Sequence, residues 1–433
     1  MPAILSTTDA DFEERFRALL ASKREDATDV DDAVAAILRD VRAEGDAALM
    51  RYTKRFDRLD LSRIGLRVSE DEIDAALAAA PPAEVDALRL AAERIRAYHA
   101  RQMPDDAMWT DPDGARLGWR WTPVDAAGLY VPGGLASYPS SVLMNAVPAR
   151  AAGVGRLVMC VPAPDGVLNP LVLAAARLSG VDEVYRVGGA QAVGAMAYGT
   201  ETIRAVDVVT GPGNAYVAAA KRQVFGRVGI DMIAGPSEVL IVADRTADPD
   251  WIALDLLSQA EHDASAQAIL VTDDAGLASA TEEAVERHLA GLDRTDVAGA
   301  AWRDFGAVVT VRDMDEAVGL ADRIAAEHLE LMVEDPDGLA ARIRHAGAIF
   351  LGSWTPEAVG DYVGGPNHVL PTARSARFSS GLSVMDFLKR TTLTAMTPEA
   401  LRAIGPAAVT LAASEGLGAH GASVAARLER LNR

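Results

Sequence analysis

From Gly128 to Leu351 the chain alternates short apolar runs with alanine-rich helical stretches, and this alternation most constrains its fold. The first set of expected strands is 157–161, 183–187 and 206–210, with helices over 170–179, 192–198 and 214–225. The second set has expected strands at 239–243, 268–272, 308–311 and 348–351. Its expected helices are 250–261, a helix that follows 268–272 and ends at His288, and 314–326. Alternation at this spacing predicts βαβ units. We therefore expect an α/β protein with two Rossmann-like domains, mostly parallel sheets, and small helical segments at both ends.

The segments outside these two sets are predicted to be helical. Residues 8–56 have apolar positions at helical spacing and predict two amphipathic helices. The expected organisation is an N-terminal helical arm over 1–24, a larger α/β domain formed by 25–125 with 238–384, a second α/β domain over 126–237, and a C-terminal helical tail over 385–433. The tail is too short to form a core alone, so we expect it to dock elsewhere, for example on a partner subunit.

The charge balance restricts the partners of this chain. Its 62 acidic and 42 basic residues give a net charge of −20, which argues against a surface that binds nucleic acid or an anionic membrane. The single cysteine, Cys160, cannot form a disulfide within the chain, and the first residues lack a basic signal region. No stretch approaches the roughly 20 uncharged apolar residues of a membrane helix. These features predict a cytoplasmic protein that handles a cationic or zwitterionic small molecule.

Four of the seven histidines lie in polar clusters near the C-terminal end, at 258–263, 327–330, 361–368 and 415–420. Gln259 and His262 are three residues apart, which places both on one face of a helix. With Asp361 and His420 they could supply two imidazoles, a carboxylate and a carboxamide, a set that suits zinc in an open site. Taken alone, each of these residues is better explained by a capping or solvated structural role.

Glu327 and His328 form the second chemical candidate. A carboxylate can activate water, and an imidazole can take a hydroxyl proton near neutral pH. Adjacent helical side chains diverge by about 100°, so the pair needs a helix end or a loop to face one substrate. A pair of structural residues at a helix end is the competing interpretation.

Three glycine-rich turns, at 130–134, 188–191 and 211–214, lie where a strand is expected to end and a helix to begin. Open α/β sheets bind ligands where strands end and helices begin. None of the turns has the G-x-G-x-x-G spacing of the usual dinucleotide fingerprint. Cys160 lies within an apolar run and is predicted to be a buried thiol. His99, His288 and His345 lie on charged helical stretches and are predicted to be at the surface.

These clusters and turns belong to longer stretches that together resemble histidinol dehydrogenases over nearly the whole chain. The stretches are 129–134, 138–145, 189–192, 211–217, 234–238, 259–263, 326–330, 365–372, 378–384 and 415–420. The resemblance implies two NAD-dependent oxidations that convert L-histidinol to L-histidine through a bound L-histidinal, as the final steps of histidine biosynthesis. It also implies a homodimer with shared active sites and one zinc ion per subunit.

The resemblance implies roles for individual residues. The zinc ligands map onto Gln259, His262, Asp361 and His420, the last of these supplied by the other subunit. The catalytic pair maps onto Glu327, which activates water, and His328, the general base. Substrate contacts map onto Ser237, Gln259, His262, His328, Asp361, His368, Glu415 and His420, and NAD contacts onto Tyr130, Gln191 and Asn214. Because Cys160 lies outside every polar cluster, we expect water, and not a thiol, to attack the aldehyde.

Three alternatives remain at this point. The first is a zinc and NAD dehydrogenase of another small polyol, such as a sulfonated diol, although acidic residues such as Glu415 would repel a sulfonate. The second is a metal-dependent hydrolase in which Glu327 activates a zinc-bound water. The third is a binding protein without catalytic activity. Dependence on NAD and turnover of a substrate panel distinguish the three.

Overall fold

The computed structural model describes residues 2–22, 30–133, 138–233 and 235–433, which fall into two compact units. Unit 1 comprises Met1–Arg101 and Asp125–Phe387, and unit 2 comprises Gln102–Val124 and Leu388–Arg433. Gly134, Ala234 and the expected boundary at residues 24–25 lie outside the described residues.

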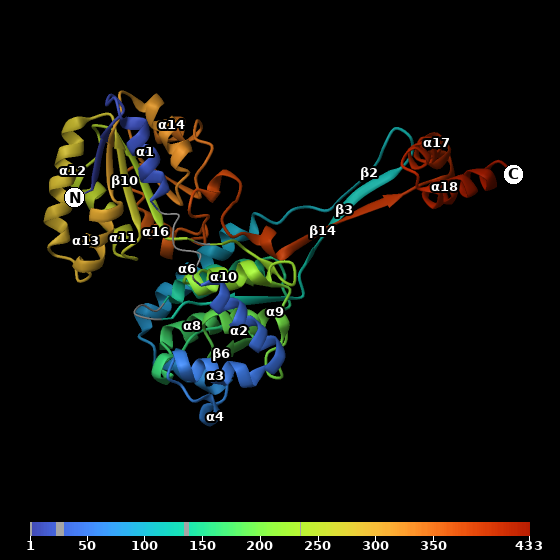
Figure 1. Cartoon of the computed structure of the whole chain (residues 1–433), viewed down its shortest axis with the longest axis horizontal. Helices are drawn as coiled ribbons and strands as arrows, with labels where there is room; N and C mark the ends of the chain where they lie inside the picture. The colour runs from blue at the N-terminus through green and yellow to red at the C-terminus, as the bar shows by residue number, and fades with distance from the viewer. Residues whose placement is uncertain (1, 23–29, 134–137, 234) are drawn as a thin grey trace. The chain divides into compact units, whose positions relative to one another are not determined.

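One part of unit 1 is built on a six-stranded parallel sheet, which we call sheet A (Figure 1). Its order is β1 (Ala3–Ser6), β11 (Ala307–Thr310), β10 (Gln267–Thr272), β9 (Glu238–Ala243), β12 (His328–Met332) and β13 (Ala348–Leu351). Successive strand residues alternate between two buried clusters, as the two-residue period of a strand requires. Val239 and Ile241 pack with α11 (Pro249–Ala260), α12 (Ala275–Leu289) and α13 (Thr295–Phe305). Leu240 and Val242 pack with α1 (Phe12–Ala21), α14 (Met314–Ile324) and α15 (Pro336–Ala340).

The N-terminal segment departs from the expected separate helical arm. Residues Ala3–Ser6 form β1, which pairs in parallel with β11 at the edge of sheet A. Phe12 and Phe16 of α1 are buried and stack at 5.3 Å between ring centroids in the same core. The arm is therefore part of the domain built on sheet A, because its apolar residues complete that core.

The second part of unit 1 is built on a five-stranded parallel sheet, sheet B. Its order is β6 (Glu183–Tyr185), β5 (Arg156–Cys160), β4 (Ala126–Tyr130), β7 (Val208–Thr210) and β8 (Gly229–Ile230). The helices that follow these strands are α7 (Pro139–Ala151), α8 (Pro170–Ser179), α9 (Gly189–Tyr198) and α10 (Ala215–Val224), and a short 3₁₀ turn spans Pro164–Gly166. The expectation of two parallel α/β sheets is confirmed.

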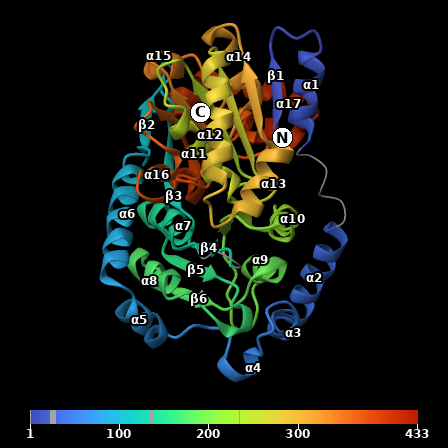
Figure 2. The same cartoon turned by 90° about the vertical axis from the view of Figure 1, so that its left-hand side faces the viewer.

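The helices of residues 31–100 correct the expected grouping of 25–125 with 238–384. They are α2 (Asp31–Glu44), α3 (Asp46–Phe56), α4 (Leu61–Ile64), α5 (Glu70–Ala79) and α6 (Pro82–Ala100), seen together in Figure 2. Val34 and Ile37 of α2 are buried in one cluster with Val193 of α9, and α5 and α6 contact α8 and α7. Their apolar faces therefore cover the helices of sheet B, and His99 of α6 is fully buried there rather than at the surface.

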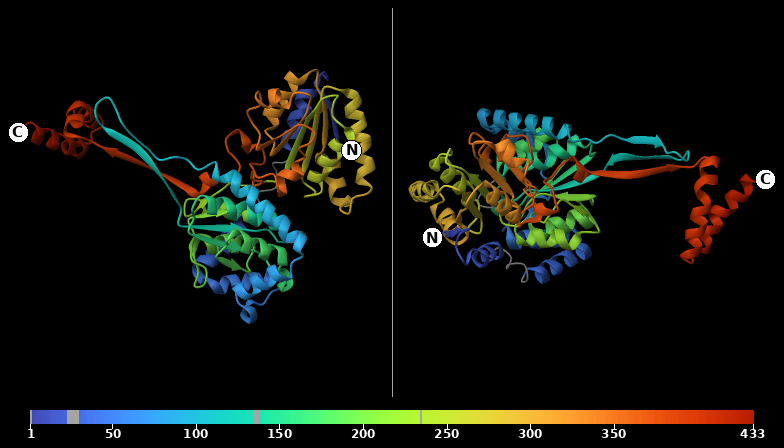
Figure 3. Two further views of the ribbon diagram at one scale, coloured as in Figure 1. Left: turned by 180° about the vertical axis from the view of Figure 1, so that it is seen from behind. Right: turned by 90° about the horizontal axis from the view of Figure 1, so that it is seen from above.

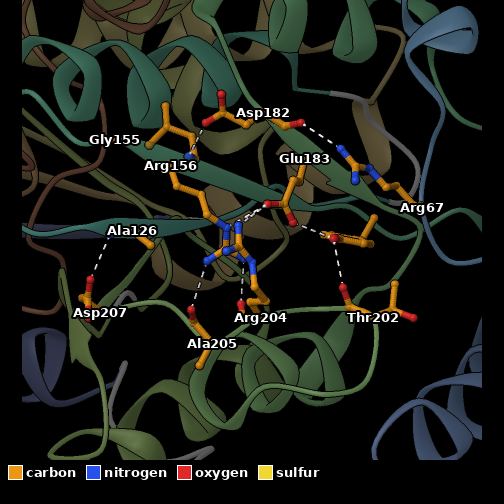
Figure 4. Close-up of polar contacts among 12 residues, drawn as sticks. Arg67, Ala126, Gly155, Arg156, Asp182, Glu183, Thr202, Arg204, Ala205 and Asp207 are labelled. Atoms are coloured by element: carbon orange, nitrogen blue, oxygen red, sulfur yellow. Dashed lines mark hydrogen bonds and ion pairs between the residues drawn. The ribbon is translucent and has the colours of Figure 1, made fainter.

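An ion-pair network ties the amino ends of β5 and β6 together (Figure 4). Nε of Arg156 donates to Oε1 of Glu183 at 2.7 Å, and the same guanidinium donates to the carbonyls of Arg204 and Ala205. The hydroxyl of Tyr185 donates to the other oxygen of Glu183 at 2.6 Å. This network lies at the edge of sheet B opposite the glycine-rich turns.

Unit 2 corrects the expectation of a purely helical tail over 385–433. It contains an antiparallel sheet of β2 (Ala107–Thr110), β3 (Arg116–Pro123) and β14 (Leu388–Ala395), followed by α17 (Pro398–Ser414) and α18 (Gly418–Leu431), which pack together (Figure 3). Unit 1 ends in α16 (Glu357–Tyr362) and two 3₁₀ turns, Ser375–Arg377 and Val384–Phe387. In the described part of the chain, no helix is both long and apolar enough to span a membrane.

Candidate active site

The polar clusters of the second strand set meet at the amino edge of sheet A. His328 is the first residue of β12, and Glu238 is the first residue of the neighbouring strand β9. Gln259 lies in the last turn of α11, which returns the chain to this edge. Glu327 and His328 were expected at a helix end or in a loop. Ala325 ends α14 in the left-handed conformation, with φ at 49°, Glu327 lies in the bend that follows, and His328 begins β12.

His328 is held as one tautomer by the oxygen atoms around its Nδ1. That nitrogen lies 3.0 Å from the carbonyl oxygen of Glu238 and 3.2 Å from Oε1 of Gln259. A carbonyl can only accept, so Nδ1 carries the proton and donates it. Nε2 is buried and has no hydrogen-bond partner among the described residues. Burial lowers the pKa of His328 to about 3, so the imidazole is neutral and Nε2 is free to accept a proton.

Glu327 is placed by the same residue that orients His328. The backbone N–H of Glu238 donates to Oε2 of Glu327 at 3.0 Å, and that oxygen lies 3.8 Å from Nδ1 of His328. Glu327 precedes β12 and His328 is its first residue. The two side chains lie close together because Glu327 accepts from the N–H of Glu238 and His328 donates to the carbonyl of the same residue. The structure thus brings the predicted catalytic pair together.

His368 and Asp361 form a second cluster in the segment after β13. Nδ1 of His368 donates to the backbone carbonyl of Asp361 at 3.1 Å, and Nε2 lies 3.4 Å from the hydroxyl of Ser141 on α7. Burial lowers the pKa of His368 to about 4 and raises the pKa of Asp361 to about 7. The side-chain amide of Asn367 donates to the carbonyl of Met144, which fixes the segment to α7.

Sequence reasoning missed a buried carboxylate that joins these clusters. Oε1 of Glu357 lies 3.4 Å from Nδ1 of His328, and His328, Glu357 and Asp361 offer ligand atoms within 4.8 Å of one another. The backbone N–H of Glu357 donates to Glu330, another buried carboxylate, which lies between two leucines of β12. An acidic residue inside an apolar strand was the available signal, but no role was predicted for Glu330.

The predicted metal ligands of unit 1 fit a metal ion by their donor chemistry. Gln259 contacts two imidazoles, since its Nε2 lies 3.3 Å from Nδ1 of His262 and its Oε1 faces His328. Asp361 belongs to the group of converging ligand atoms, whereas His262 does not. Imidazole nitrogen with amide and carboxylate oxygen is a donor set suited to zinc.

Three further predicted residues are Ser237, Glu415 and His420. Ser237 directly precedes β9, where its carbonyl accepts from Gln267. Glu415 ends α17 and His420 lies in the first turn of α18, so both belong to unit 2, where both are exposed.

The predicted NAD contacts lie at the carboxyl edge of sheet B. Tyr130 ends β4, and its hydroxyl accepts from the backbone N–H of Gly189 at 3.1 Å. Burial raises the pKa of Tyr130 to about 12. Gln191 is buried in the first turn of α9, and Asn214 caps α10 by accepting from Tyr216 and Val217. All three follow or flank the glycine-rich turns, at the edge where open α/β sheets bind ligands.

Known proteins share this fold and sequence over the full length. A family model described as histidinol dehydrogenase matches residues 20–428. Histidinol dehydrogenase of Ruegeria pomeroyi is 70% identical over 432 residues, with 100% of both chains covered. That of Rhodospirillum rubrum is 66% identical over 431 residues, with 99% of both covered. The crystal structure of histidinol dehydrogenase from Elizabethkingia anophelis superposes with a TM-score of 0.95 at 37% identity, covering 100% of this chain and 99% of that one.

Proposed function

The chain belongs to the histidinol dehydrogenase family of oxidoreductases, and from that premise we propose that it oxidises L-histidinol to L-histidine in two NAD-dependent steps through a bound L-histidinal. The observation that carries the proposal is the state of His328. Its Nδ1 proton is engaged by the Glu238 carbonyl, and its Nε2 is a neutral, buried acceptor with no hydrogen-bond partner among the described residues. Removal of a hydroxyl proton needs a base with an accessible lone pair held in place, and Nε2 of His328 offers one.

In the first step Nε2 of His328 accepts the proton of the substrate hydroxyl, while the carbon loses a hydride. Bound NAD supplies the hydride acceptor in both steps. In the second step the carboxylate of Glu327 accepts a proton from the water that attacks the aldehyde. Glu327 is placed for this role because the backbone N–H of Glu238 holds its carboxylate beside His328.

We propose that Gln259, His262 and Asp361 hold a zinc ion together with His420 from the partner subunit. The metal would anchor the nitrogen donors of the substrate and so orient its hydroxymethyl carbon. Ser237, His368 and Glu415 complete the proposed substrate contacts, and Tyr130, Gln191 and Asn214 the proposed NAD contacts. Exposure of Glu415 and His420 in unit 2 supports a homodimer in which the active sites are shared.

The acidic site suits a cationic substrate, which favours histidinol over the sulfonated diol. The hydrolase alternative needs no NAD, and the converging catalytic pair argues against a binding protein without activity. The charge balance and the biosynthetic reaction support a cytoplasmic location.

The test is the amount of NADH formed per L-histidinol consumed, with and without a zinc chelator. We expect two NADH per substrate and loss of activity on chelation, restored by zinc. One NADH with released aldehyde contradicts the role of Glu327, and turnover without NAD contradicts the whole assignment.

A further inference from the structure

A buried ion pair lies beneath the turn that leads into α10. Lys221 of α10 and Asp231, which directly follows β8, form a salt bridge, and their side chains are 2% and 0% exposed. The other ion pairs of sheet B are more accessible, since even Arg156 and Glu183 are 15% and 12% exposed. Burying two charges costs several kcal/mol per ion before their attraction is counted. An ion pair that is buried to this extent therefore requires a structural or functional explanation.

Both members of the pair bind the backbone of one residue, Gly211. The ammonium of Lys221 donates to the carbonyl of Gly211 at 3.0 Å, and the N–H of Gly211 donates to Oδ2 of Asp231 at 2.8 Å. Both polar groups of this peptide segment are thus fixed from opposite sides by a charge. Hydrogen bonds to ionised groups are roughly twice as strong as neutral ones.

Gly211 needs this support because it is tightly confined. Its φ of 111° is available only to glycine at low cost, and a Cβ there would overlap the carbonyl oxygen of Tyr130. The turn therefore rests directly on the backbone of Tyr130. Three residues later, Asn214 caps α10. Two of the three proposed NAD contacts flank the residue that the ion pair holds.

We propose that Lys221 and Asp231 are positioning residues for NAD, which set the Gly211–Asn214 turn against Tyr130. The inference rests on the proposed function, because it takes Tyr130 and Asn214 as NAD contacts. Because both side chains are buried, the pair would act through the backbone and not by contact with the cofactor. It fixes the backbone from which the contacts project, and a shift of about 1 Å in such a group is enough to cost about 100-fold.

The test compares Asp231→Asn with the wild-type protein in two measurements. NADH affinity is measured by fluorescence titration without histidinol, and the Michaelis constants for NAD and histidinol are measured separately. We expect the dissociation constant for NADH and the KM for NAD to rise about 10- to 100-fold. The KM for histidinol should stay within about twofold, because the amino edge of sheet A is not altered.

Glu183→Gln is the matched control, since it breaks a largely buried ion pair of the same sheet at the opposite edge. It should lower the melting temperature without changing NADH affinity. If Asp231→Asn does not fold, Lys221→Gln replaces it, because glutamine still offers a donor to the Gly211 carbonyl without the charge. Raised NADH dissociation constants in either variant, with the control unchanged, support the inference.

Two results separate failure of the inference from failure of the proposed function. If the wild-type protein oxidises histidinol and binds NADH, but the variants lose stability with unchanged NADH affinity, the pair is only structural and the inference is overturned. If the wild-type protein does not bind NADH at all, the proposed function fails first, and the inference fails with it.

Discussion

Replacing Glu327 by glutamine should separate the two oxidation steps. The side chain keeps its shape, and its remaining oxygen can still accept from the Glu238 N–H that now binds Oε2 at 3.0 Å. Exchange of a charged for a neutral acceptor costs about 1 kcal/mol of stability, which a folded domain tolerates. What is lost is the group that takes a proton from water. A general base contributes about 10²- to 10⁴-fold, or about 3–5 kcal/mol of the barrier.

The first oxidation uses His328 and should proceed within about tenfold of the wild-type rate, since Nδ1 is held mainly by the Glu238 carbonyl at 3.0 Å and only weakly by Glu327 at 3.8 Å. The assay is rapid mixing of excess enzyme with histidinol and NAD, followed by absorbance of NADH. Wild-type protein should form two NADH per substrate. Glu327→Gln should form one at a fast rate and the second about 100 to 10,000 times more slowly.

Glu334→Gln is the control, because Glu334 is exposed just beyond the other end of β12. It should form both NADH at wild-type rates. The reasoning is refuted if Glu327→Gln slows both phases equally, which would make the residue an orienting group for His328, or if it forms two NADH at the wild-type rate.

Three further predictions follow from buried groups. Cys160→Ala should leave both oxidation steps intact in the same NADH assay, because the thiol is fully buried in an apolar cluster and burial raises its pKa; loss of only the second step would reinstate a thiol mechanism. Although burial opposes it, hydrogen bonds from Arg156 and Tyr185 lower the pKa of Glu183 to about 2, so its stabilising effect is present above the unfolded pKa near 4.5 and lost as the pH falls toward 2. The stability gap between wild type and Glu183→Gln in urea unfolding should therefore shrink across that range, and a constant gap would contradict the shift. Leu5→Ala should lower the free energy of unfolding by about 2–3 kcal/mol, because Leu5 is 2% exposed in the core of sheet A; an unchanged urea midpoint would show that β1 does not contribute to that core.

The parallel strands could be predicted because they are buried on both faces and therefore form continuous apolar runs, such as 268–272. β1 and β14 were missed for the opposite reason. Ala3–Ser6 is four residues long and ends in serine, and Leu388–Ala395 is mostly exposed and carries Lys389 and Arg390. Their strand conformation depends on partners far away in the sequence, β11 and β3, which a local pattern does not reveal.

The site residues could be proposed from their chemistry, but not their arrangement. The pattern around Glu327 and His328 indicated a helix end or a loop, and it did not show that a strand begins at His328. Nothing in the sequence around Glu357 distinguished it from other glutamates. It lies close to His328 because its backbone N–H donates to the carboxylate of Glu330, which joins α16 to β12. The sequence also did not show which of the two sheets α2 packs on, because the apolar face of α2 would fit either core.

Strand register, rather than side-chain packing, sets the spacing of the catalytic pair. β12 pairs with β9 so that His328 lies beside Val239, which puts the N–H and the carbonyl of Glu238 within reach of Glu327 and His328 respectively. A slip of one residue would turn every side chain of β12 to the other face. Packing prevents that slip, because Leu329 and Leu331 would have to leave the cluster that they share with α1 and α14, and the buried carboxylate of Glu330 would enter it in their place. The burial that folds sheet A therefore also fixes which nitrogen of His328 is free. Since the partner of Nδ1 is a backbone carbonyl, which does not titrate, the same nitrogen stays available through both oxidation steps.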